Sequence, residues 1–107
     1  MTSLSTHVLD TTLGRPVAAL AVTLAAPDGR TCDGLTDSDG RCRNWSAEDL
    51  APGRYCLRFH TGDYLRTVHG SAFYPHVDIW FEITEAQGHY HIPLLLSPFG
   101  FSSYRGS

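Results

Sequence analysis

Hydrophobic and polar residues alternate with a period of two along much of the chain. Because successive side chains of a strand point to opposite faces, this pattern predicts β-strands that each bury one face. In the last of these segments, Tyr90 and Ile92 are expected in the core, while His89 and His91 share the other face. Five segments follow the pattern, at residues 4–9, 19–24, 54–59, 77–82 and 89–92.

Turn-forming residues separate these segments. Short strands with this punctuation are typical of an all-β sandwich or barrel. Only residues 62–70 break the period, and we interpret them as a short helix with Asp63 at its N-cap and Gly70 just beyond its end. The turn sequences are Leu-Gly-Arg-Pro (13–16), Pro-Asp-Gly (27–29), Asp-Ser-Asp-Gly (37–40), Ala-Pro-Gly (51–53) and Ser-Pro-Phe-Gly (97–100).

Length and charge narrow the classes of function. The 107 residues predict a single domain, residues 1–107, with one modest core. There is no lysine, the eight basic residues are scattered arginines and the net charge is -3, which argues against a nucleic-acid-binding protein. No apolar stretch approaches the roughly 18 residues of a membrane-spanning helix, and the N-terminus does not resemble a secretory signal, so we expect a cytoplasmic protein with no membrane partner. The three cysteines match no metal motif and are interpreted as thiols in a reducing compartment.

His89 and His91 are the most distinctive polar pair. On a strand, both rings emerge on one face, with their Cα atoms roughly 7 Å apart. Such a pair can bind zinc or copper if a third ligand joins it, and it can also supply general acid–base groups because histidine titrates near neutral pH. The spacing alone favours two half-exposed histidines that have no role.

Two further residues are candidates for the same site. His7 lies on the first predicted strand, and its importance depends on whether it faces the histidine pair. Arg41 directly follows the turn at 37–40, so its guanidinium can be presented for two parallel hydrogen bonds to a carbonyl or carboxylate, although a solvated turn arginine fits as well. The turn lacks the later ligands of a calcium loop, so we reject calcium. The residues alone therefore indicate a small all-β domain with a polar site and no identified substrate.

The C-terminal sequence carries a family resemblance. From His89 to Ser107 it reads His-Tyr-His-Ile-Pro-Leu-Leu-Leu-Ser-Pro-Phe-Gly-Phe-Ser-Ser-Tyr-Arg-Gly-Ser, which resembles the ending of the 5-hydroxyisourate hydrolases, the transthyretin-related enzymes of urate breakdown. The terminal Tyr-Arg-Gly-Ser is the most specific part, because hormone-binding transthyretins lack it. Phe99 and Phe101 stand where the family commonly has tyrosine. Further matches are Leu-Ser-Thr-His-Val-Leu-Asp (4–10), Gly-Arg-Pro-Val-Ala (14–18), Thr-Asp-Ser-Asp-Gly-Arg (36–41), Thr-Gly-Asp-Tyr (61–64) and Phe-Tyr-Pro (73–75).

The resemblance implies a fold, an assembly and an activity. The fold is a two-sheet, eight-stranded transthyretin-like β-sandwich with one short helix. The assembly is a homotetramer, a dimer of dimers, with active sites in a channel between dimers. The activity is hydrolysis of 5-hydroxyisourate to 2-oxo-4-hydroxy-4-carboxy-5-ureidoimidazoline in purine catabolism, without a cofactor or metal.

The resemblance also assigns roles to residues. Its catalytic set falls on His7, Arg41, His91 and Ser107, and its substrate-binding set on His7, Arg41, Tyr104 and Arg105. We expect His7 as the general base and His91 as the acid or the group that positions water, two roles that can be exchanged, and His89 has no assigned role. Two alternatives stay open: a transthyretin-like carrier of a small aromatic ligand, and a zinc-dependent hydrolase that uses His7, His89 and His91.

Overall fold

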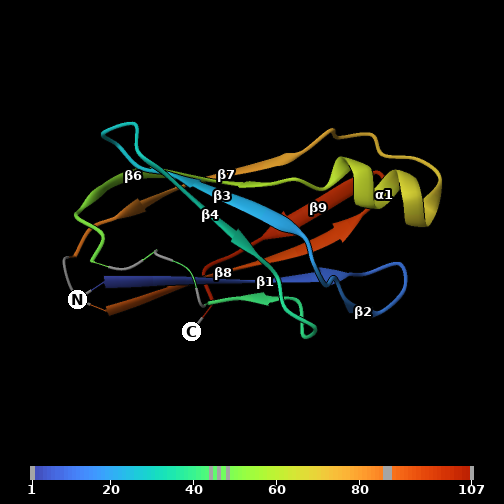
Figure 1. The fold of residues 1–107 in the computed structure, drawn as a ribbon, viewed down its shortest axis with the longest axis horizontal. Coiled ribbons are helices and arrows are strands. Elements are labelled where there is room, and N and C mark those ends of the chain that lie inside the picture. The colour runs from blue at the N-terminus through green and yellow to red at the C-terminus, as the bar shows by residue number, and fades with distance from the viewer. Residues whose placement is uncertain (1, 44, 46, 48, 86–87, 107) are drawn as a thin grey trace.

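The computed structural model describes residues 2–43, 45, 47, 49–85 and 88–106. Within these residues, nine strands form two sheets that pack face to face (Figure 1). The first sheet has the order β2-β1-β8-β9, and β5 also pairs with β1. Its strands are β1 (Thr2–Asp10), β2 (Arg15–Pro16), β5 (Arg41–Cys42), β8 (Gly88–Ser97) and β9 (Gly100–Ser103). The second sheet has the order β4-β3-β6-β7, with β3 (Ala21–Ala25), β4 (Thr31–Leu35), β6 (Gly53–Phe59) and β7 (Val77–Ile83).

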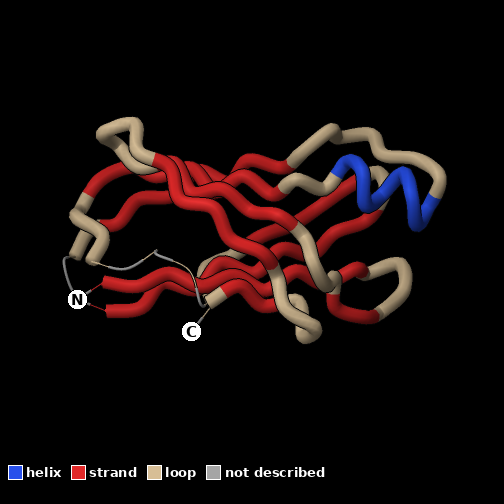
Figure 2. The backbone as a smooth tube through the Cα atoms, viewed as in Figure 1, coloured by secondary structure: helices blue, strands red, loops and turns tan. Residues whose placement is uncertain are grey.

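A single helix among the described residues, α1 (Gly62–His69), lies at one end of the sandwich (Figure 2). This architecture confirms the predicted two-sheet sandwich with one short helix. The count of nine strands exceeds the expected eight because the two-residue strands β2 and β5 both pair with β1. In the part of the chain that the structure describes, no helix is long and apolar enough to cross a membrane.

The predicted N-cap of the helix is wrong by two residues. The carbonyl of Thr61 accepts the first intrahelical hydrogen bond, from the N–H of Leu65, so Thr61 is the N-cap and Asp63 lies inside the first turn. There the Asp63 carboxylate faces the positive end of the helix dipole and pairs with Arg66 at 2.7 Å. Gly70 ends the helix in the left-handed conformation, φ 81°, as the sequence predicts.

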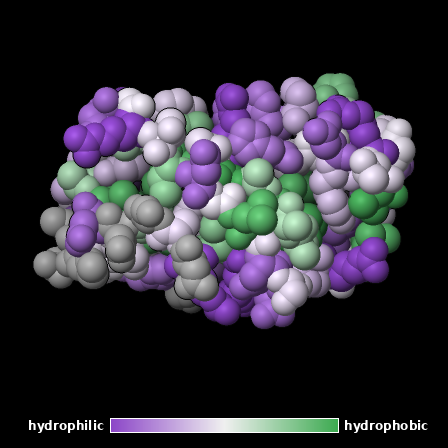
Figure 3. Space-filling model, viewed as in Figure 1, coloured by the Kyte–Doolittle hydropathy of each residue, from purple (hydrophilic) through white to green (hydrophobic). Residues whose placement is uncertain are grey.

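The core lies between the two sheets and sets which residues face outward. Leu4 and Val8 of β1 and Ile92 and Leu94 of β8 are buried against the second sheet. The alternate residues of these two strands therefore form the outer face of the first sheet. Figure 3 shows the same division: hydrophilic residues line the upper and lower margins, and hydrophobic residues gather between them.

A buried carboxylate joins the end of β1 to the helix. The fully buried side chain of Asp10 accepts hydrogen bonds from the Tyr64 hydroxyl and His69 Nε2, both at 2.6 Å, and from the backbone N–H groups of Thr12 and Leu13 at 3.0 Å. Burial alone would raise the pKa of Asp10, but these donors outweigh burial and lower it. Burial and the Asp10 carboxylate raise the pKa of Tyr64 to about 12. This cluster fixes α1 against the sandwich, far from the histidine pair.

Candidate functional site

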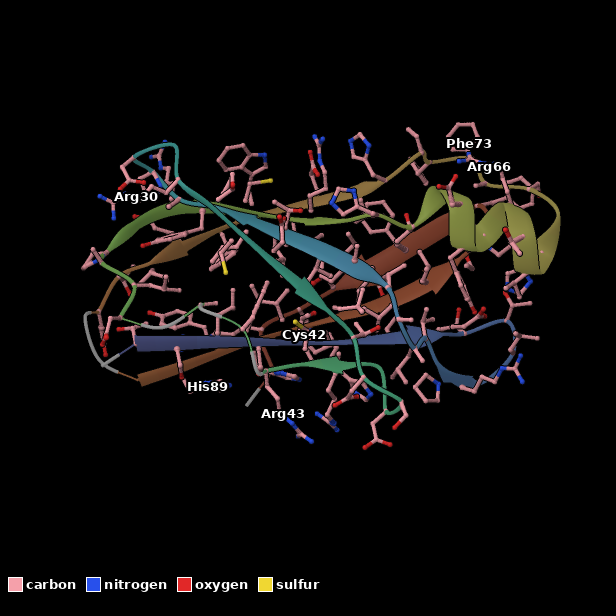
Figure 4. The ribbon with its side chains drawn as sticks, viewed as in Figure 1. Arg30, Cys42, Arg43, Arg66, Phe73 and His89 are labelled. Atoms are coloured by element: carbon pink, nitrogen blue, oxygen red, sulfur yellow. The ribbon has the colours of Figure 1, made fainter. Side chains whose placement is uncertain are left out.

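The candidate site lies on the outer face of the first sheet. A small open cavity of about 190 Å³ is lined by polar side chains of β1, β5 and β8 and of the residues beside them. Figure 4 shows His89 and Arg43 on this outer side, directed away from the second sheet. The lining residues are Ser5, Thr6, Arg41, Arg43, His89 and His91.

Strand register brings the histidines to this face. β1 and β8 pair in parallel, with Ser3 opposite His89 and Ser5 opposite His91. Because Tyr90 and its alternate neighbours are drawn into the core, the residues between them must point outward. The predicted placement of His89 and His91 on one face is thus confirmed, and both share it with two serines of the neighbouring strand.

A tight turn delivers Arg41 to the same face. The Asp37 carboxylate accepts the backbone N–H groups of Asp39 at 2.8 Å and of Arg41 at 3.0 Å, which folds the turn onto itself. Gly40 has φ +76°, and a Cβ there would lie 2.6 Å from the carbonyl oxygen of Val8, so only glycine lets the turn dock on β1. β5 then pairs Arg41 with His7.

His7 is fixed in one tautomer by this turn. Its Nε2 lies 2.8 Å from the backbone carbonyl oxygen of Asp39. A carbonyl oxygen only accepts hydrogen bonds, so Nε2 must carry the proton and Nδ1 of a neutral His7 keeps its lone pair. His7 is therefore prepared to accept a proton at Nδ1.

The electrostatics of the face favour a neutral His91. Burial lowers the pKa of His91, and the positive charge of Arg41 and the neighbouring His7 and His89 lower it further, while Ser5 opposes the shift. Next to Arg41, burial raises the pKa of the Cys42 thiol to about 11, so this cysteine is not a thiolate nucleophile at neutral pH. The site thus combines neutral imidazole with a fixed guanidinium charge.

A chain of hydrogen bonds connects the serines and histidines. Ser3 Oγ lies 2.6 Å from His89 Nδ1, His89 Nε2 lies 2.8 Å from Ser5 Oγ, and Ser5 Oγ lies 2.7 Å from His91 Nδ1. Sequence reasoning assigned no role to Ser3, Ser5 or Arg43. Only the parallel register of β1 and β8, which the sequence pattern does not reveal, would have pointed to the two serines.

The C-terminal tail returns to His91. The N–H of Gly106 donates to the carbonyl of His91 at 2.8 Å, and a Cβ at Gly106 would lie 2.7 Å from Cδ2 of the His91 ring. Tyr104 and Arg105 lie elsewhere: both line a cavity of about 720 Å³ between β7 and β9, and the Arg105 guanidinium stacks 4.2 Å from the centre of the Tyr90 ring. Their predicted contact with substrate stays a prediction. Ser107 lies outside the described residues.

The structure thus brings together three of the predicted catalytic residues, His7, Arg41 and His91. Within the residues described, no three histidine, cysteine or carboxylate side chains form a set that could hold a metal ion. Two imidazoles beside a guanidinium can accept a proton, donate a proton and stabilise negative charge on an oxygen.

The chain is similar over its full length to known proteins. Residues 4–106 match the model of the HIUase/Transthyretin family. A 5-hydroxyisourate hydrolase of Caulobacter vibrioides is 41% identical, with 100% of both chains covered. Among solved structures, the 5-hydroxyisourate hydrolase of Klebsiella pneumoniae superimposes with a TM-score of 0.89 at 38% identity and full coverage of both chains. A transthyretin from Sparus aurata superimposes with a TM-score of 0.85 at 28% identity, covering 96% of this chain and 95% of its own.

Proposed function

This chain belongs to the HIUase/transthyretin family, and from that premise we propose that it hydrolyses 5-hydroxyisourate in purine catabolism. The observation that carries the proposal is the meeting of His7, Arg41 and His91 on one outer face, in a chain similar over its full length to proteins named 5-hydroxyisourate hydrolase. We further propose that residues 1–107 act as one domain, which the family match over 4–106 supports.

Hydrolysis of the amide-like C–N bond needs a base for the attacking water and an acid for the leaving nitrogen. We assign the base to His7, because its hydrogen bond to the Asp39 carbonyl leaves Nδ1 as an acceptor. We assign the acid to His91, because Ser5 occupies Nδ1 and leaves Nε2 for the substrate. Each histidine therefore receives the role that its own hydrogen bond permits.

Negative charge develops on the carbonyl oxygen as water attacks. Arg41 is the group we assign to stabilise it, because it lines the cavity together with His91 and its guanidinium carries a positive charge. Preorganised charge of this kind needs no rearrangement during the reaction. Arg43 lines the same cavity and adds positive charge for a substrate rich in carbonyl groups.

The tail and the assembly belong to the same proposal. We propose a homotetramer in which Tyr104, Arg105 and Ser107 contribute to catalysis and substrate binding at a site shared between subunits. Support comes from β7 and β9, which lie at the edges of their sheets. Trp80 of β7, Phe101 of β9 and Tyr104 just after β9 are exposed at 71%, 39% and 59% of their surface. Sedimentation velocity that gives a monomer at micromolar concentration would contradict it.

A cytoplasmic location is part of the proposal. Its support is that Cys32, Cys42 and Cys56 are all free thiols, as in proteins of reducing compartments. Fractionation of the native cells tests this location, and recovery of the protein with secreted or membrane fractions would contradict it.

Two alternatives are less favoured. A carrier would bind its ligand unchanged, whereas the cavity on the outer face presents two imidazoles and two guanidinium groups, which suit a small polar heterocycle better than an apolar hormone. The zinc-hydrolase alternative would require a ligand set that the described side chains do not form.

The test begins with 5-hydroxyisourate generated in place from urate by urate oxidase. We expect the protein to accelerate loss of the substrate absorbance above the spontaneous rate. In water enriched in oxygen-18, one heavy oxygen should enter the product, and a chelator should not change the rate. An unaccelerated decay would refute the proposed hydrolase, and a chelator-sensitive rate would favour the zinc enzyme.

A further inference from the structure

Four side chains on the outer face form one unbroken line of hydrogen bonds, and none of them requires a substrate to be in place. The line runs Ser3, His89, Ser5, His91, with heavy-atom distances of 2.6, 2.8 and 2.7 Å. Ser5 is its centre: the residue is only 8% exposed, and its single hydroxyl lies between two imidazole nitrogens. Ser3 is the outer end, and its bond to His89 lies at the surface.

While both rings are neutral, a continuous donor-to-acceptor line through these groups can run in only two directions. A neutral imidazole has one N–H and one lone pair, and the Ser5 hydroxyl continues the line when it donates to one ring nitrogen and accepts from the other. If Ser5 donates to His91 Nδ1, it accepts from His89 Nε2–H, and His89 Nδ1 then accepts from Ser3. If Ser5 instead accepts from His91 Nδ1–H, all three bonds reverse together.

The direction of the line decides what His91 can do. When the line runs from Ser3 towards His91, the proton of His91 is on Nε2, and the ring can donate it. When the line runs the other way, Nε2 has the lone pair. The Arg41 charge beside the ring makes a doubly protonated His91 unfavourable, and a neutral imidazole that only loses a proton would become an anion. If a proton reaches Nδ1 as Nε2 gives its own proton away, the ring stays neutral throughout.

Resting on the proposed hydrolase function, we propose that Ser5 and His89 form a proton relay that positions His91 and resupplies its proton during hydrolysis. The relay deepens the role of His91 and gives His89 a role that sequence reasoning could not assign. Ser5 and His89 act through His91 and are positioning residues. Ser3 connects the relay to solvent.

The proton transfers balance. As the C–N bond breaks, His91 Nε2–H gives its proton to the leaving nitrogen. In the same motion the Ser5 hydroxyl proton moves to His91 Nδ1, the His89 Nε2 proton moves to Ser5, the Ser3 hydroxyl proton moves to His89 Nδ1, and solvent water gives one proton to Ser3. The proton removed from the attacking water passes to His7 and then to solvent, so one water molecule is consumed and no proton is gained or lost. Before the next turnover the line returns to its first direction: His91 Nε2 takes one proton from solvent, each proton moves back along the line, and Ser3 returns one proton to solvent.

Substitutions in the relay test this inference through kcat. We expect Ser5→Ala and His89→Gln each to lower kcat about 10- to 100-fold while KM changes by less than about threefold. Ser5→Thr keeps the hydroxyl and should restore most of kcat. Ser102→Ala is the matched control. Ser102 is an exposed serine of β9 on the outer face of the first sheet, and it takes no part in the line.

Coupling between the two sites distinguishes a relay from two separate structural effects. If Ser5 and His89 act as one path, the kcat of the double variant Ser5→Ala/His89→Gln should be no lower than that of the less active single variant. The solvent deuterium isotope effect on kcat should also fall in Ser5→Ala, because fewer protons move in the step. Additive losses, or an unchanged isotope effect, would overturn the relay.

Imidazole ¹⁵N NMR supplies a reading that needs no substrate. We expect protons on Nε2 of both His89 and His91, and a changed Nδ1 signal of His91 in Ser5→Ala but not in Ser102→Ala. An active wild type whose Ser5→Ala and His89→Gln variants keep full kcat would overturn the relay alone. A wild type inactive towards 5-hydroxyisourate would instead refute the proposed function, and with it any catalytic role for the relay. His89→Gln is a change at an exposed residue, so it remains decisive if Ser5→Ala does not fold.

Discussion

The contact between Gly106 and the ring of His91 makes Gly106→Ala a sharp test of where the tail lies. A Cβ at Gly106 would come within 2.7 Å of His91 Cδ2, and ordinary contact begins at 3.4 Å, so the tail or the ring must move by about 0.7 Å. The ring is held on its other side by Ser5 and has little freedom to yield. A misplacement near 1 Å costs on the order of 10²-fold in rate. We therefore expect kcat to fall about 10- to 100-fold, or about 1.4–2.7 kcal/mol in the barrier.

The matched control is Gly100→Ala on β9. A Cβ there would meet only Ser97 Oγ, at an ordinary 3.7 Å, so its activity should equal that of the wild type. Decay of 5-hydroxyisourate absorbance gives both rates, and circular dichroism checks that both variants are folded. A folded Gly106→Ala variant with the full wild-type rate would show that the tail does not lie against His91.

Three further changes extend these expectations. Arg41→Gln should lower kcat about 10²-fold by removing a preorganised charge; it should also raise the pKa of His91, because the Arg41 charge helps to hold that pKa below its usual 6.5, and an unchanged titration of the His91 imidazole by NMR would contradict this. Asp10→Asn should cost about 2–4 kcal/mol of unfolding free energy, since a buried carboxylate with charged hydrogen bonds is lost. Because the pKa of Asp10 is lowered in the folded state, the stability that its carboxylate contributes is full above about pH 4 and is lost as the pH falls through the folded-state pKa. The unfolding free energy of Asp10→Asn, measured in urea, should therefore depend less on acid pH than that of the wild type. The same pH dependence in both proteins would refute the role of Asp10. Deleting residues 104–107 should abolish hydrolysis while the sandwich stays folded, and an active truncated protein would contradict the proposed role of the tail.

The strands that pack into the core were predictable from the sequence. The alternation that placed Tyr90 and Ile92 inward also placed His89 and His91 outward, as the structure confirms. β4 was not recognised because its inward residues, Cys32 and Gly34, are too small to give a strong hydrophobic period. β2 and β5 were missed because strands of two residues have no period at all.

The parts of the site that escaped prediction depend on register between distant segments. The sequence around Ser3 and Ser5 carries no motif that marks these serines as part of a site. They became candidates only because they lie opposite His89 and His91 where β1 pairs in parallel with β8. The buried cluster of Asp10, Tyr64 and His69 was missed for the same reason, because Asp10 is more than fifty residues from both Tyr64 and His69. Arg41 was found because the turn before it is a local feature.

The most direct measurement compares the wild type with the double variant His7→Asn/His91→Asn at equal concentration in the absorbance assay. The two histidines are the proposed proton carriers on the outer face, and the substitutions keep polar side chains of similar size. We predict rapid decay of 5-hydroxyisourate with the wild type and only the spontaneous rate with the folded double variant. Equal, accelerated decay with both proteins would contradict the catalytic site described on β1 and β8.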